Sequence, residues 1–222
     1  MNKTAVSGII LAGGESRRLG QDKAFLTLGS KTLTEIIRDK LKSVLGEAEL
    51  IISANQLEKY KNFKRLSPAV AGTDSSPLRR GEKIVPDVFP ERSSLNGIYS
   101  SLRAAENFYG FVIACDLPLV NPEFIKYLIN QREEYDVVIP ESLTGLEPLC
   151  AVYSKNCLSL MERQLKNKNF KIIEFFPEIK LKVINLKKID WLKSPEEAGI
   201  FNINTIEDYT CLLKQKKIAG SP

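Results

Sequence analysis

Short apolar runs alternate with amphipathic segments along most of the chain, and this alternation limits the folds that it can adopt. The runs typical of strands fall at residues 6–11, 50–53, 111–115, 137–140, 149–153 and 183–186. The segments with helical spacing fall at residues 32–45, 95–105, 122–133, 158–165 and 206–213. Strands that alternate with helices predict an α/β fold with helices on both faces of a mostly parallel sheet. We therefore expect a three-layer α/β/α, Rossmann-like arrangement.

The length of 222 residues limits the number of domains. It suits one generous α/β domain over residues 1–222 and is too short for two comfortable ones. No apolar run approaches the roughly 20 residues that a membrane helix needs. The first apolar run is also too short, and too soon followed by Arg17 and Arg18, to be a signal peptide. We expect a cytoplasmic protein without membrane contact.

The chain contains no histidine, which removes several kinds of catalysis. Ser-His-Asp and Cys-His nucleophiles, histidine-ligated zinc and histidine acid–base chemistry are all excluded. The four cysteines stand far apart without a C-x-x-C pair, which favours free thiols over disulfides. The net charge of +5 suits an anionic small molecule or a solvated lysine-rich surface. Because nucleic-acid binding needs a concentrated basic stripe and these lysines are dispersed, we expect no nucleic-acid partner.

A loop rich in glycine and arginine follows the first expected strand, in the run L-A-G-G-E-S-R-R-L-G-Q-D-K. Gly13 and Gly14 let the backbone turn sharply and bring its amide groups close to a ligand. Arg17 and Arg18 supply forked donors that match phosphate oxygens, and Lys23 adds a compact charge. These residue types predict a polyphosphate cradle, although a turn whose charges face water has the same composition. The spacing fits neither the P-loop nor the G-x-G-x-x-G pattern.

An aspartate, Asp116, stands at the end of the expected strand at 111–115. Ligands of parallel sheets bind outside the carboxyl ends of the strands, so this aspartate and the glycine turn are expected to share one crevice. A carboxylate that faces a polyphosphate can hold Mg²⁺, which prefers one or two carboxylates together with phosphates and waters. We therefore expect Mg²⁺ as the cofactor and Asp116 as its ligand.

The pattern L-A-G-G-x-S-x-R-x-G-x-D-K resembles the signature loop of the molybdenum cofactor guanylyltransferases, a family within the nucleotide-diphosphosugar-transferase-like folds. The resemblance implies that Lys23 neutralises the nucleotide's phosphates. It also implies nucleotide contacts from the main-chain amides of Leu11, Ala12, Gly13 and Gly14. The second glycine resembles the guanine-using branch, since cytidylyl-transferring relatives tend to have L-A-A-G at this point.

Three later segments also resemble motifs of this family. The run C-D-L-P around Asp116 is similar to the magnesium-binding motif. Asn55 is similar to an asparagine that contacts the nucleoside, although an asparagine after a strand is commonly a turn residue. Asp87 is similar to the aspartate before the family's G-P-L-x-G motif, where this chain has two serines in place of Gly-Pro; a turn-initiating aspartate is the alternative. A carboxylate there suits guanine, whose N1–H and N2–H₂ are adjacent donors.

The C-terminal run F-N-I-N-T-I-E-D resembles the closing motif of the family. The resemblance implies that Asn202 and Asn204 bind the acceptor, through its pterin or its phosphate. Thr205 and Asp208 also have nearly the spacing of a capping box for the last helix. The segment at 146–153 resembles a family strand that borders the acceptor pocket.

The resemblance implies transfer of GMP from GTP to molybdopterin, with or without molybdenum, to give the guanine dinucleotide cofactor and pyrophosphate. Lys23, Arg17 and Arg18 would stabilise charge on the leaving pyrophosphate, and Asp116 would hold Mg²⁺. Expected partners are GTP, a molybdopterin-type acceptor and, transiently, a molybdoenzyme or cofactor-delivery protein. Three alternatives stay open: CTP as donor, a sugar phosphate as acceptor, or a nucleotide-binding adaptor without turnover.

Residues 67–82 form a long, polar stretch that is rich in turn-forming residues and contains Arg79 and Arg80. Such a composition predicts a surface loop. It is either a simple insertion, which we favour, or a lid that carries two arginines.

Overall fold

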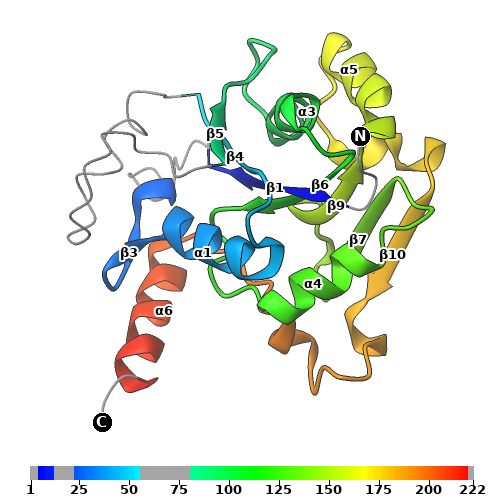
Figure 1. The fold of residues 1–222 in the computed structure, drawn as a ribbon. Helices are drawn as coiled ribbons and strands as arrows, with labels where there is room; N and C mark the ends of the chain where they lie inside the picture. The colour runs from blue at the N-terminus through cyan, green and yellow to red at the C-terminus, as the bar shows by residue number, and fades with distance from the viewer. Residues whose placement is uncertain (1–4, 13–22, 56–80, 220–222) are drawn as a thin grey trace.

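The computed structural model describes residues 5–12, 23–55 and 81–219, which form a single large sheet covered by helices (Figure 1). The strand order in the sheet is β10-β7-β9-β6-β1-β4-β5. These strands are β1 (Val6–Leu11), β4 (Leu50–Ser53), β5 (Glu82–Val85), β6 (Tyr109–Ala114), β7 (Val137–Ser142), β9 (Cys150–Ser154) and β10 (Leu181–Asn185). A short strand β8 (Gly145–Leu146) pairs with β7, and β2 (Thr27–Leu28) pairs with β3 (Lys31–Thr32) as a separate hairpin.

The strand directions place most carboxyl ends at one edge of the sheet. Strands β6, β1, β4 and β5 are parallel neighbours, and β10 is parallel to β7. Strand β9 is antiparallel to both β6 and β7, so it alone among the seven runs in the opposite sense. We call the edge at which the other six end the carboxyl edge. The expectation of a mostly parallel sheet is confirmed.

The antiparallel direction of β9 follows from its connection to β7. Only residues 143–149, which include β8, separate the two strands. A connection between parallel neighbours needs a dozen residues or more, whereas a short hairpin returns the chain antiparallel.

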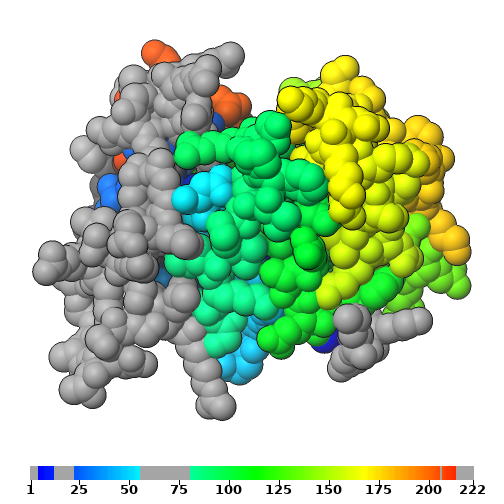
Figure 2. All heavy atoms as spheres, turned by 90° about the horizontal axis from the view of Figure 1, so that it is seen from above, coloured from blue at the N-terminus to red at the C-terminus, as the bar shows by residue number. Residues whose placement is uncertain are grey.

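Helices cover both faces of the sheet, which confirms the three-layer expectation. In Figure 1, α1 (Leu33–Leu45) and α4 (Pro122–Asn130) lie on one side, and α3 (Ser94–Ala104) and α5 (Leu158–Lys166) lie on the other. Figure 2 views the second side, where the α3 and α5 regions lie next to each other. Side chains alternate between the two faces of the sheet along β1, so that Ile10 packs with α1 and α4 on one face and Ile9 packs with α3 on the other.

The helices begin at residues that suit their positions. Thr32 caps α1 in a capping box with Glu35, and Ser93 caps α3. Asn121 caps α4, whose first residue is Pro122. The last helix, α6 (Ile206–Ala219), packs near the β2–β3 hairpin and the start of α1 through a small apolar cluster. Short 3₁₀ helices occupy Lys23–Phe25, Lys155–Cys157, Ile172–Glu178, Leu186–Lys188 and Pro195–Ala198.

Strand β5 departs from the sequence-based expectation, which placed Glu82 at the end of a polar loop. Glu82 is instead the first residue of β5, and its Oε1 forms an ion pair with Lys42 Nζ of α1 at 2.5 Å. The rest of the expected loop up to residue 80, including Arg79 and Arg80, lies outside the described residues. No helix in the described part of the chain has both the length and the apolar character needed to span a membrane.

Candidate functional site

Four neighbouring strands end side by side at the carboxyl edge and place the candidate residues in a row. Ala12 follows β1 directly, while Asn55, Asp87 and Asp116 each stand two residues beyond the ends of β4, β5 and β6. Pairing continues past the strand ends, because the Ala12 amide donates to the carbonyl of Ser53 at 3.0 Å. At roughly 4.8 Å per strand, the row from β5 to β6 spans about 14 Å. That length accommodates a base at one end and phosphates at the other.

At the β6 end of the row, Lys23 bridges two distant parts of the chain. Its Nζ lies 3.0 Å from Oδ2 of Asp116 and 2.9 Å from Oδ1 of Asn204. The Lys23 and Asp116 side chains are only 19% and 18% exposed, so their ion pair is partly shielded from water. The amide of Ile203 donates to the carbonyl of Asp116 at 3.0 Å, which brings the C-terminal segment to this point. The structure therefore brings Lys23, Asp116 and Asn204 together.

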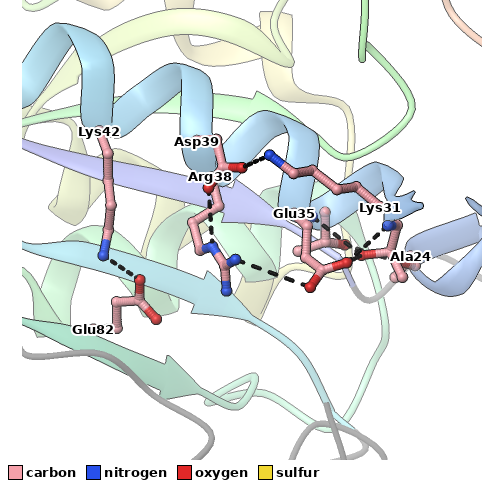
Figure 3. A network of polar contacts seen from close by, with 9 residues as sticks. Ala24, Lys31, Glu35, Arg38, Asp39, Lys42 and Glu82 are labelled. Atoms are coloured by element: carbon pink, nitrogen blue, oxygen red, sulfur yellow. Dashed lines mark hydrogen bonds and ion pairs between the residues drawn. The ribbon is translucent and has the colours of Figure 1, made fainter. Parts of the chain in front are cut away.

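Helix α1 fixes the segment that carries Lys23. The buried hydroxyl of Thr34 donates to the carbonyl of Ala24 at 2.9 Å, and the amide of Leu33 donates to the carbonyl of Leu26 at 2.8 Å. Figure 3 shows Ala24 beside the start of α1, where the chain enters the helix. Because these bonds tie the backbone on the C-terminal side of Lys23 to a buried helix, the lysine approaches Asp116 from a defined direction.

One oxygen of Asp116 is suited to a hard cation. Oδ1 is buried and has no hydrogen-bond partner among the described residues, while Oδ2 pairs with Lys23. A buried carboxylate oxygen is costly to leave unsatisfied, so it is a natural position for a ligand atom. Within residues 5–12, 23–55 and 81–219, no three Asp, Glu or Cys side chains gather into a metal cage. The arrangement fits Mg²⁺, which takes few protein carboxylates and completes its shell with phosphates and waters.

At the β5 end of the row, Asn55 and Asp87 form a reciprocal pair. Asn55 Nδ2 donates to Asp87 Oδ2 at 2.6 Å, and the Asp87 amide donates to Asn55 Oδ1 at 2.9 Å. Burial raises the pKa of the Asp87 carboxyl, and the hydrogen bond from Asn55 and the charge of Arg92 oppose this rise. Gly97 of α3 lies below, where an added Cβ would be 3.8 Å from Asp87 Oδ1 and 3.0 Å from Ser53 Oγ. Asp87 is thus held in a tightly packed, half-buried position.

Of the remaining candidate residues from the sequence, the structure describes Leu11 and Ala12 but not the residues between Ala12 and Lys23. The Ala12 amide donates to the carbonyl of Ser53, and its contact with a nucleotide stays a prediction. Gly13, Gly14, Arg17 and Arg18 lie outside the described residues, between Ala12 and Lys23. Leu11 pairs in the sheet with Ser53 and Ala114 as the last residue of β1.

The C-terminal segment supplies a contact that the sequence did not predict. Asn204, expected to bind the acceptor, hydrogen-bonds to Lys23, whereas Asn202 is partly exposed and has no recorded side-chain hydrogen bond to the described residues. The capping box is confirmed, since Asp208 Oδ2 accepts from the amides of Asn204 and Thr205 at 2.9 Å. The Asp208 amide in turn donates to Thr205 Oγ1 at 3.1 Å. The C-terminal run F-N-I-N-T-I-E-D contains no pattern that predicts the hydrogen bond from Lys23 to Asn204.

The three-layer fold and this row of strand ends define a nucleotidyltransferase. The family model described as MobA-like NTP transferase domain matches residues 8–178, and the chain belongs to this family. The probable molybdenum cofactor guanylyltransferase of Clostridium perfringens (strain 13 / Type A) is 35% identical over 214 residues, which cover 96% of this chain and 98% of that protein. The molybdenum cofactor guanylyltransferase of Desulfosudis oleivorans is 37% identical, with 92% of each chain covered.

Solved structures show the same fold. The molybdopterin-guanine dinucleotide biosynthesis protein A of Archaeoglobus fulgidus aligns with a TM-score of 0.75 at 22% identity, covering 96% of this chain and 100% of that one. The 4-diphosphocytidyl-2C-methyl-D-erythritol synthase of Anaerococcus prevotii aligns with a TM-score of 0.68 at 16% identity, covering 96% of each chain. At these identities the likeness concerns the fold.

Proposed function

We propose that the protein transfers GMP from GTP to molybdopterin in a Mg²⁺-dependent reaction that yields the guanine dinucleotide cofactor and pyrophosphate. The observation that carries this proposal is the convergence of Lys23, Asp116 and Asn204 at one end of a row whose other end holds Asn55 and Asp87. The names of the relatives support the choice of donor and acceptor.

The base end of the row suits guanine. The Asp87 carboxylate would accept from N1–H and N2–H₂ of the base, a pair of adjacent donors that cytosine and uracil lack. Asn55 holds this carboxylate through one oxygen, which fixes its orientation. Because Asp87 is partly buried, its hydrogen bonds to a base are shielded from water.

The other end of the row suits the triphosphate. Asp116 would hold Mg²⁺, which when bound neutralises phosphate charge and orients the triphosphate. Lys23 would donate to phosphate oxygens and stabilise charge on the leaving pyrophosphate, and we propose that Arg17 and Arg18 add to this effect. Asn204 keeps the Lys23 ammonium in place through its side-chain carbonyl.

The reaction needs positioning more than proton transfer. An oxygen of the acceptor's terminal phosphate attacks the α-phosphorus of GTP, and the bond to the bridging oxygen of the β-phosphate breaks. The attacking phosphate is already ionised near neutral pH, so a chain without histidine can support this step. Asn202 precedes Ile203, whose amide donates to the carbonyl of Asp116, and it remains our candidate for contact with the acceptor. The product would pass to a molybdoenzyme or cofactor-delivery protein by transient contact in the cytoplasm.

Pyrophosphate release tests the proposal directly. We expect release from GTP only when molybdopterin and Mg²⁺ are present, with little release from CTP, ATP or UTP. A preference for CTP, or release with glucose 1-phosphate in place of molybdopterin, would assign the protein to another branch of nucleotidyltransferases. No release with any pair of donor and acceptor would leave a nucleotide-binding adaptor as the better description.

A further inference from the structure

A second carboxylate–carboxamide pair lies at the far end of the carboxyl edge. Asn185 is the last residue of β10 and pairs in register with Glu141 near the end of β7. Asn185 Nδ2 donates to Glu141 Oε2 at 3.2 Å. This is the same chemical arrangement as Asn55 with Asp87, because each pair joins the carboxyl ends of two adjacent parallel strands of one sheet.

A cavity of about 180 Å³ opens at the second pair. Its lining consists of Glu141, Ser142, Leu143, Asn185, Leu186, Lys187 and Pro195. The volume is below the roughly 300–1,000 Å³ of pockets that enclose a whole drug-sized ligand, so the cavity suits one ring-shaped end of a longer molecule. Buried Leu186 and exposed Leu143 offer apolar surface beside the carboxylate.

The polar groups of the cavity are held in fixed positions. Asn185 Oδ1 accepts from the amide of Lys187 at 3.0 Å, so the orientation of the carboxamide is set. Ser142 Oγ donates to Glu147 Oε1 at 2.7 Å across the hairpin that joins β7 to β9. A site with preset donors and acceptors loses less entropy when it binds a flat polar ring.

The cavity and the Lys23–Asp116 pair share one edge of the sheet. Strands β9 and β7 separate β6 from β10, so the distance along the edge is about 14 Å at ~4.8 Å per strand. The chain after β10 returns along this edge, since the amide of Asn121 donates to the carbonyl of Ala198 and the amide of Ile203 to that of Asp116. An extended acceptor whose phosphate lies near Asp116 would therefore direct its other end along this edge toward the cavity.

We propose that Glu141 and Asn185 bind the pterin ring of the acceptor by its 2-amino-4-oxopyrimidine edge. This inference rests on the proposed function, because it assigns the far end of the same acceptor. That edge of a pterin presents an amino group, a ring N–H and a carbonyl, which is the pattern that guanine would present to Asp87 in the proposed function. The Glu141 carboxylate accepts from the two donors, and the Asn185 amide faces the carbonyl.

A binding titration that needs no turnover tests the inference. Free pterin and lumazine, in which an oxygen replaces the 2-amino group, are titrated against wild type, Glu141→Gln and the matched control Glu123→Gln, whose side chain is 73% exposed on α4. We expect wild type and the control to prefer pterin over lumazine. Glu141→Gln should bind pterin about 10-fold or more weakly, as for loss of a charged hydrogen-bond acceptor, and lose the preference.

GTP-induced stabilisation separates a local effect from misfolding. All three proteins should show the same rise in Tm with GTP and Mg²⁺, because Glu141 lies at the opposite end of the edge from the proposed base site. Equal pterin binding by Glu141→Gln and wild type, or equal binding of pterin and lumazine by wild type, overturns the inference.

The acceptor KM separates this inference from the proposed function. If GMP transfer to molybdopterin occurs and Glu141→Gln leaves the acceptor KM unchanged, the pterin assignment is wrong while the function stands. If pterin selectivity depends on Glu141 but no nucleotide is transferred, the proposed reaction fails and the pterin site remains.

Discussion

Replacing Lys23 with alanine should separate catalysis from stability. The ammonium group contacts both Asp116 and Asn204, so Lys23→Ala leaves a carboxylate oxygen and a carboxamide oxygen without this donor. Because the Lys23 and Asp116 side chains are 19% and 18% exposed, water only partly compensates for the lost pair. We estimate a loss of ~1–2 kcal/mol in the free energy of unfolding. For a chain of this size that corresponds to a fall in Tm of about 2–8 °C.

The expected effect on turnover is much larger. A donor that stabilises charge developing in the transition state contributes a factor of about 10²–10³ to kcat. We therefore expect kcat for pyrophosphate release to fall at least about 100-fold in Lys23→Ala.

Lys42→Ala is the matched control. Lys42 Nζ lies 2.5 Å from Glu82 Oε1, and the Glu82 side chain is 1% exposed at the start of β5, away from the carboxyl edge (Figure 3). This variant should lose at least as much Tm as Lys23→Ala, since it removes the ion-pair partner of a more deeply buried carboxylate, yet keep near-normal turnover. The reasoning is refuted if the two variants lose similar activity, or if Lys23→Ala stays within about threefold of wild type, far from the 100-fold expected.

Three further substitutions and one control, Glu207→Ala, test other parts of the structure. Since burial raises the pKa of Asp87, its ionised form destabilises the protein without nucleotide at pH values above that pKa. Asp87→Asn should therefore raise Tm slightly at pH 7, and the gain in Tm should shrink as the pH falls through the raised pKa. Calorimetry should show weaker GTP binding by this variant. Asp208→Ala should lower the midpoint of urea unfolding through loss of its half of the α6 capping box, and Glu207→Ala should leave that midpoint almost unchanged. Gly199→Ala should lower Tm by several degrees, because an added Cβ would lie 2.1 Å from the Leu119 carbonyl oxygen at a φ of +69°.

The sequence predicted the parts of the fold whose hydrophobic pattern is strong. The strand at 6–11 matches β1 in full, and the helix at 32–45 matches α1 with Thr32 as its cap. Strand β5 was missed because it has four residues, none of them fully buried, and begins with a glutamate that looks like loop. The direction of β9 depends on pairing partners, which a local pattern does not contain.

The candidate site was predicted where residues follow strand ends, because parallel strands bring those ends together. This argument anticipated that Asp116 lies near the segment expected to bind phosphate, and the structure shows it paired with Lys23. It did not anticipate the bond from Lys23 to Asn204, 181 residues away, since that contact depends on how the C-terminal segment crosses the strand ends. Glu141 and Asn185 gave no signal, because each belongs to an ordinary strand and their pairing appears only in the register.

The Mg²⁺ dependence of nucleotide affinity tests the central claim most directly. The affinity for the α,β-methylene analogue of GTP is measured with and without Mg²⁺ for wild type and for Asp116→Asn. If Asp116 and Lys23 bind one metal–triphosphate, Mg²⁺ should strengthen binding to wild type about 10-fold or more, and Asp116→Asn should lose most of this gain. An equal gain from Mg²⁺ in both proteins would contradict the account.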